Sequence, residues 1–194
     1  MKIRSAGCAL AAFVALSCGR ASRAPAAPAP AGAPRAILRG GQNGEARVLG
    51  GPERCFNARD DDGNGLIDEG CGLRTGLVQF VIAWDARTAD VDLLVTDPKG
   101  ELSDVGRPTS SGLVKERDCP GRHDECAGKN YENVYLEKEE ARRGTYKVSV
   151  RLERLEDEDV PIRVTLGARI GPKVYVAEVD LMSIEERADL KFEL

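Results

Sequence analysis

Residues 145–152 read Thr-Tyr-Lys-Val-Ser-Val-Arg-Leu, with an apolar side chain at every second position. Successive side chains of a β-strand point to opposite faces, so a period of two predicts a strand with one buried and one solvated face. Turn sequences such as Asp-Pro-Lys-Gly at 97–100 and Gly-Pro at 171–172 bound similar segments. The same alternation recurs at 77–84, 90–97, 162–170, 174–181 and 188–194.

This strand pattern determines the predicted fold class. No long amphipathic helix pattern lies between the segments, which argues against alternating strand–helix layers. About seven or eight short strands separated by turns are typical of an antiparallel β-sandwich. We therefore predict an all-β chain in which residues 76–194 form an antiparallel β-sandwich, Ig-like or jelly-roll-like, preceded by a disordered N-terminal signal and linker.

The strand residues also carry a family resemblance. Trp84-Asp85 is followed by Ala-Asp-Val-Asp-Leu-Leu-Val-Thr-Asp-Pro-Lys-Gly at 89–100, Asn-Tyr-Glu-Asn-Val-Tyr at 130–135 and Gly-Thr-Tyr-Lys-Val at 144–148. In this order, residues 76–182 resemble the YfaP-type (DUF2135) β-sandwich domains, although Leu94 stands where a polar or aromatic residue is common. The resemblance implies an exported, envelope-associated bacterial protein, and it says more about fold than about function.

Composition narrows the function classes. The 194 residues are 42% hydrophobic and 31% charged, which is enough apolar material for a sizeable core. The net charge of −4 lacks the basic excess of a nucleic-acid binder. The only histidine is His123, so histidine-cluster zinc sites are excluded and any Ser-His-Asp triad would depend on one residue. We predict a non-catalytic binding or structural module.

The first residues are typical of an export signal. Lys2 and Arg4 precede an apolar run at 6–16, which is too short for a spanning helix of about 20 residues. Residues 14–19, Val-Ala-Leu-Ser-Cys-Gly, resemble a bacterial lipoprotein signal that is cleaved before a lipidated Cys18, although Ala15 is smaller than the usual aliphatic residue there. Residues 1–17 would then be a signal peptide. Ordinary cleavage nearby, with Cys18 incidental, is the alternative.

A spacer follows the predicted lipidation site. Residues 18–52 are rich in Ala, Pro and Gly, and such small side chains bury too little apolar area to offset the entropy of ordering them. Proline favours an extended, semi-rigid conformation that would hold the domain away from a membrane. We therefore expect an exported protein of the bacterial cell envelope, lipid-anchored to a membrane on its periplasmic or outer surface.

The remaining cysteines predict two disulfides. With Cys8 in the signal and Cys18 lipidated, an even number is left in an exported chain. Four cysteines allow three pairings, of which the simplest is local, because each bond would then close one polar loop. The four cysteines are Cys55, Cys71, Cys119 and Cys126.

The segment between the first two of these cysteines predicts a calcium site. Oxygen ligands at positions 1, 3 and 5, with glycine at position 6, open a calcium loop, and Asp60, Asp62, Asn64 and Gly65 fit this spacing. Cys71 stands at position 12, where a bidentate glutamate is usual. These hard oxygen donors suit Ca²⁺ and offer nothing soft for copper or zinc. The predicted ligands are Asp60, Asp62, Asn64, Leu66 through its carbonyl, Asp68 and Glu69.

Residues 53–72 are also similar to the Asp-rich, cysteine-bounded repeats of bacterial surface proteins, including the MopE-type motif and thrombospondin type 3 repeats. This resemblance likewise implies calcium. Five acids within ten residues, at 60–69, would repel one another without a cation. The alternative is an Asp-, Asn- and Gly-rich turn closed by a disulfide, with no ion bound.

A second polar site is possible in the sandwich. Asp90 and Asp92 share one face of their predicted strand. Together with Asp118, Glu132 and Asn133 they can form a second oxygen site or a polar edge for a carbohydrate. The alternative is a set of strand-end acids that face solvent.

These features together predict a calcium-stabilised binding or assembly module of the cell envelope, whose partner is another envelope protein or a surface glycan. Two alternatives of other kinds remain. One is a secreted or envelope metal-dependent hydrolase that uses the acidic loop. The other is a carbohydrate-binding surface module.

Overall fold

The computed structural model describes residues 50–194 except 121–125, 127 and 137–139. The predicted signal peptide, Cys18, most of the linker and His123 lie outside the described residues. Within the described ranges, no helix is long and apolar enough to cross a membrane.

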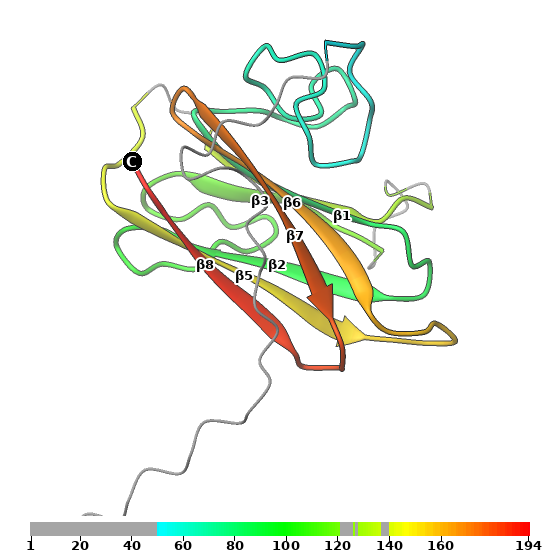
Figure 1. The fold of residues 1–194 in the computed structure, drawn as a ribbon. Coiled ribbons are helices and arrows are strands. Elements are labelled where there is room, and N and C mark those ends of the chain that lie inside the picture. The colour runs from blue at the N-terminus through cyan, green and yellow to red at the C-terminus, as the bar shows by residue number, and fades with distance from the viewer. Residues whose placement is uncertain (1–49, 121–125, 127, 137–139) are drawn as a thin grey trace, which may run out of the picture. The chain divides into compact units, whose positions relative to one another are not determined.

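The described residues form eight strands in two antiparallel sheets (Figure 1). One sheet has the order β3-β4-β1-β6-β7 and the other has the order β2-β5-β8. The predicted antiparallel β-sandwich is therefore confirmed. The strands are β1 (Val78–Trp84), β2 (Asp90–Thr96), β3 (Leu113–Asp118), β4 (Tyr131–Leu136), β5 (Thr145–Arg154), β6 (Ile162–Ile170), β7 (Lys173–Leu181) and β8 (Arg187–Glu193).

The main core lies between the two sheets. Strands β5 and β8 bury alternate side chains, as their period of two requires. Phe80 of β1 meets Tyr146 and Phe192 of the other sheet, with ring centroids 6.2 and 5.4 Å apart. Full burial of each such aromatic side chain contributes about 1.5–3 kcal/mol. The alternating buried side chains thus pack the two sheets against each other.

Strand β1 departs from the half-buried pattern, because all seven of its residues are buried. Its outer face is covered by the cysteine-bounded loop, residues 53–72, whose Ala58 and Ile67 pack in a second apolar cluster with Val81 and Ala83. Figure 1 shows this loop, in cyan, on the side of the five-stranded sheet away from β2, β5 and β8. The loop is thus packed against the sheet as part of the folded domain.

Strands β3 and β4 are the ones that alternation alone did not delineate. All six residues of β4 are buried, including Glu132 and Asn133, so the strand shows no polar face. Glu132 shares the inward side with Val134, whereas Asn133 bonds to Gln79 on the outer side at 3.2 Å. A strand buried on both faces with polar residues on each cannot show a period of two in hydropathy.

Close packing of the loop on the sheet predicts the effect of one added methyl group. A Cβ at position 167 on β6 would lie 2.3 Å from the carbonyl oxygen of Ala58. We expect Gly167→Ala to lower the free energy of unfolding by about 1–3 kcal/mol, because backbone must shift to admit the methyl group. Chemical denaturation measures this. Gly51→Ala is the control, since its Cβ would meet nothing within 4 Å; equal effects of the two substitutions would contradict the packing argument.

Candidate metal centre in the cysteine-bounded loop

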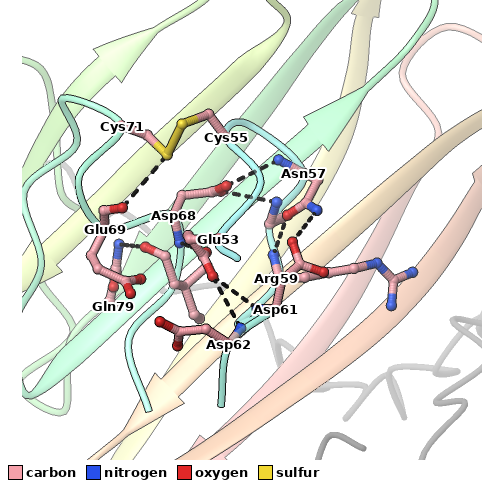
Figure 2. The surroundings of a disulfide bond; sticks show 12 residues. Glu53, Cys55, Asn57, Arg59, Asp61, Asp62, Asp68, Glu69, Cys71 and Gln79 are labelled. Carbon is pink, nitrogen blue, oxygen red and sulfur yellow. Dashed lines mark hydrogen bonds between the residues drawn. A yellow bond between two sulfur atoms is a disulfide. The ribbon is translucent and has the colours of Figure 1, made fainter. Parts of the chain in front are cut away.

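Both cysteine pairs are local. The Cα atoms of Cys55 and Cys71 lie 5.3 Å apart and those of Cys119 and Cys126 lie 5.8 Å apart, each with its sulfurs joined. These spacings are usual for disulfides. The simplest of the three predicted pairings is therefore confirmed, and the first bond closes the base of the acidic loop (Figure 2).

The loop begins with tight turns made by its own acidic side chains. The carboxylate of Asp60 accepts hydrogen bonds from the N–H groups of Gly63 at 2.7 Å and Gly65 at 2.9 Å. Gly65 has a φ of 86°, a conformation that glycine adopts without steric cost. Asn64 continues the pattern, since its Oδ1 accepts the N–H of Leu66 at 2.8 Å. The glycine predicted at the sharp turn thus has the expected role.

Glu53, which begins this loop just before Cys55, joins the arrangement. Glu53 Oε2 accepts the N–H of Asp61 at 2.9 Å, and its Oε1 accepts the N–H of Asp68 at 2.9 Å. One carboxylate oxygen from each of Glu53, Asp60 and Asp62 lies within 4.8 Å of the other two. Sequence reasoning missed Glu53 because it precedes Cys55 and has no position in the calcium-loop spacing.

Glu69 lies beside the same group. Its Oε1 is hydrogen-bonded by the Nδ2 of Asn64, and its Oε2 is buried with no hydrogen-bond partner. Burial raises the pKa of Glu53, and the negative charge of Glu69 adds to this rise against the backbone N–H groups that lower it. The carboxylates therefore repel one another, and an unpartnered oxygen is held among them.

One predicted ligand, Asp68, is engaged away from this group. Asp68 is fully buried, and its two oxygens accept the N–H groups of Asn57 at 3.1 Å and Ala58 at 2.9 Å (Figure 2). Burial raises its pKa to about 6, although those N–H groups oppose the rise. Leu66, the predicted carbonyl ligand, is half-buried. Asp68 therefore organises the loop backbone instead of facing Asp60 and Asp62.

The donor chemistry fits a hard divalent cation. Glu53, Asp60, Asp62 and Glu69 present carboxylate oxygens, which Ca²⁺ and Mg²⁺ prefer, and part of this group is open to solvent. The buried, unpartnered Oε2 of Glu69 is an acceptor that a bound cation would satisfy. These residues are therefore compatible with the predicted Ca²⁺. Glu53 joins the predicted ligands, whereas the carboxylate of Asp68 binds backbone N–H groups instead.

The second predicted polar site is partly assembled. Carboxylate oxygens of Asp92, Asp118 and Glu132 lie within 4.8 Å of one another, whereas Asn133 faces the other side of β4. Sequence reasoning missed the cation that balances them: Lys115 Nζ lies 2.7 Å from Asp118 Oδ1 and 3.0 Å from Glu132 Oε2. The sequence does carry one signal: Lys115 follows Leu113 by two residues, so both side chains point to the same, buried face of β3.

The two aspartates of β2 are paired with arginines of the neighbouring strand. Arg151 lies 2.8 Å from Asp92, and Arg154 lies 3.5 Å from Asp90. Burial raises the pKa of Asp90, and the charge of Asp92 adds to the rise. Asp90 and Asp92 thus belong to ion pairs across β2 and β5, and their half-buried positions differ from the fully solvent-facing alternative.

Comparison of the chain with protein-family models, with curated proteins and with solved structures finds no match. The resemblances to YfaP-type domains and to Asp-rich calcium repeats therefore stay predictions.

The pKa of Asp68 predicts a pH dependence of stability. Because the folded-state pKa of about 6 exceeds the ordinary 3.8, folding favours the protonated carboxyl, and this stabilisation is lost as the pH rises through about 6. Between about pH 7.5 and about pH 5 we expect the free energy of unfolding of the native protein to rise by about 1 kcal/mol relative to Asp68→Asn.

Urea titrations of both proteins in chelator measure this difference. Parallel pH profiles for the native protein and Asp68→Asn would contradict it. The variant also loses the carboxylate that accepts two backbone N–H groups, so it should be less stable at every pH.

Proposed function

We propose that this chain is a non-catalytic lipoprotein of the bacterial cell envelope, whose β-sandwich is a binding or assembly module stabilised by Ca²⁺. The observation that carries the proposal is the carboxylate group of Glu53, Asp60, Asp62 and Glu69 in a loop that a disulfide closes and the sheet supports. Two disulfides in one small domain agree with an exported protein. Lipidation of Cys18 would anchor it to a membrane.

A cavity beside the loop supports the binding role. It has a volume of about 510 Å³, within the usual range for ligand sites. The cysteine-bounded loop supplies one wall through Phe56, Asn57 and Arg59, and strands β1 and β6 supply another through residues that include Trp84 and Thr165. The N–H of Asn57 also donates a hydrogen bond to the carboxylate of Asp68. The conformation of the loop therefore sets the shape of this wall. Calcium would thus stabilise both the fold and the cavity.

Calcium removal is the direct test of the proposed site. A ligand that binds only the folded state stabilises it by about 2.7 kcal/mol when its free concentration is a hundred times the Kd. We therefore expect Ca²⁺ to raise the midpoint of thermal unfolding of the oxidised protein and excess chelator to lower it. Calorimetric titration should show one Ca²⁺ bound per chain.

Matched variants make this test specific. Asp60→Asn and Asp62→Asn should abolish the response to Ca²⁺, and Glu53→Gln should weaken it, because each removes a charged donor from the group. Glu140→Gln changes an exposed acid outside the loop and should leave the response intact. A midpoint that is the same in Ca²⁺ and in chelator would overturn the calcium assignment.

A surface glycan is the second candidate partner, and the cavity favours it. Its walls combine apolar Phe56 and Pro161 with polar Asn57, Glu158 and Arg163, a mixture suited to a hydroxyl-rich ligand. Glycan-array binding of the oxidised protein should be lost in Arg163→Ala and kept in Arg187→Ala, which alters β8 instead. Loss in both variants, or binding by neither the native protein nor the variants, favours an envelope protein as the partner.

The enzyme alternative has its own decisive result. A metal-dependent hydrolase would show hydrolytic activity that Asp60→Ala or Asp62→Ala abolishes. The single histidine and the carboxylate-only donor group make us rank this activity below the binding role.

A further inference from the structure

Lys115 is a buried lysine in contact with two carboxyl groups. Its residue exposure is 6%, and Glu132 beside it is fully buried. The ammonium nitrogen lies 2.7 Å from Asp118 Oδ1 and 3.0 Å from Glu132 Oε2. Asp118, in contrast, has a side chain that is 41% exposed. One amine therefore sits between a dry carboxyl group and one that reaches solvent.

An irregularity in β3 creates this juxtaposition. Residues three apart in a regular strand point to opposite faces, so Lys115 and Asp118 should not meet. The register between β3 and β4 shifts between Lys115 and Arg117, and Asp118 then pairs with Glu132. The extra residue of a β-bulge turns the following side chain to the other face. The bulge thus brings both reactive groups to the same side as Glu132.

We propose that Lys115 and Asp118 react with each other to form an intramolecular amide bond, with Glu132 as the proton carrier. In this step the Nζ of Lys115 attacks Cγ of Asp118 and one carboxylate oxygen leaves. Glu132 takes a proton from the ammonium and returns it to the leaving oxygen, and the second proton lost by nitrogen completes one molecule of water. One cation and one anion become a neutral amide, so atoms and charges balance without any co-reactant.

The contacts of Glu132 suit a proton carrier. Its Oε2 touches the amine and also accepts the N–H of Leu93 at 2.6 Å, which links the two sheets and holds the carboxyl group in place. Its Oε1 is buried and has no hydrogen-bond partner. Burial raises the pKa of Glu132 well above its usual range, so a protonated carboxyl is accessible. Burial lowers the pKa of Lys115, but attraction to Glu132 and Asp118 outweighs this and keeps the resting amine charged.

Physical chemistry favours the product over the ion pair in this setting. A buried ammonium carries a desolvation cost, which ion pairing only partly offsets. Amide formation removes that charge. Fixed neighbours also react as if present at very high concentration, with effective molarities of about 10⁵–10⁸ M for well-oriented groups. The partial exposure of Asp118 gives the released water a route to solvent.

Peptide mapping of the full chain, reduced and alkylated, tests the proposal. The fragment that contains residues 115–118 should be one water lighter than its sequence, and fragmentation should place the new bond between Lys115 and Asp118. Trypsin should fail to cut after Lys115, because it needs a free lysine side chain. A fragment of full sequence mass with normal cleavage would leave only a buried ion pair and overturn the proposal.

Three variants separate this bond from other losses of water. Lys115→Arg keeps the positive charge but should show the full sequence mass; the same loss in this variant would indicate a cyclic imide at Asp118 and overturn the proposal. Asp118→Ala should also keep the full mass, and a link from Lys115 to Asp92 there or in the native protein would overturn the choice of Asp118. Glu132→Gln should lack the bond, whereas unchanged conversion would exclude Glu132 as the proton carrier. None of these outcomes depends on calcium.

Discussion

The two hydrogen bonds that the buried carboxylate of Asp68 accepts from Asn57 and Ala58 are the constraint on which the loop depends. They fold the start of the cysteine-bounded loop back over its end, so that Ala58 and Ile67 can pack against β1. The same fold presents Asp60 and Asp62 toward Glu53 and forms one wall of the cavity. A carboxylate kept dry at the cost of a raised pKa thus connects packing, candidate metal ligands and cavity.

The molecule holds two acidic groups that differ in how their charge is balanced. In the loop, the carboxylates of Glu53, Asp60 and Asp62 gather near the surface, where an added cation would balance their charge. Inside the sandwich, Lys115 lies against Asp118 and Glu132. This ammonium group already balances the carboxylates, so a divalent ion has little reason to bind there. The two cations would compete for the same oxygens and repel each other.

Prediction from sequence succeeded where one physical rule acted alone. The strands β2, β5 and β8 bury every second residue, and hydropathy reports that directly. The prediction of half-buried strands failed where another segment packs on the outer face of a sheet. Val81 and Ala83 occupy the outer face of β1, but the loop covers them, so the strand is not half-buried. Glu53 and Lys115 were missed because their roles arise from contacts with residues distant in sequence or displaced by a bulge.

The sequence by itself determined the antiparallel β-sandwich and the acidic, glycine-containing turn, since both follow from local spacing. Four cysteines in two loops made local disulfides the simplest pairing. Only the tertiary structure decided which acids face one another, because carboxylate direction depends on burial and on which backbone N–H groups are near. That is why Asp68 turned inward, Glu53 joined Asp60 and Asp62, and Lys115 met Glu132 across a strand irregularity.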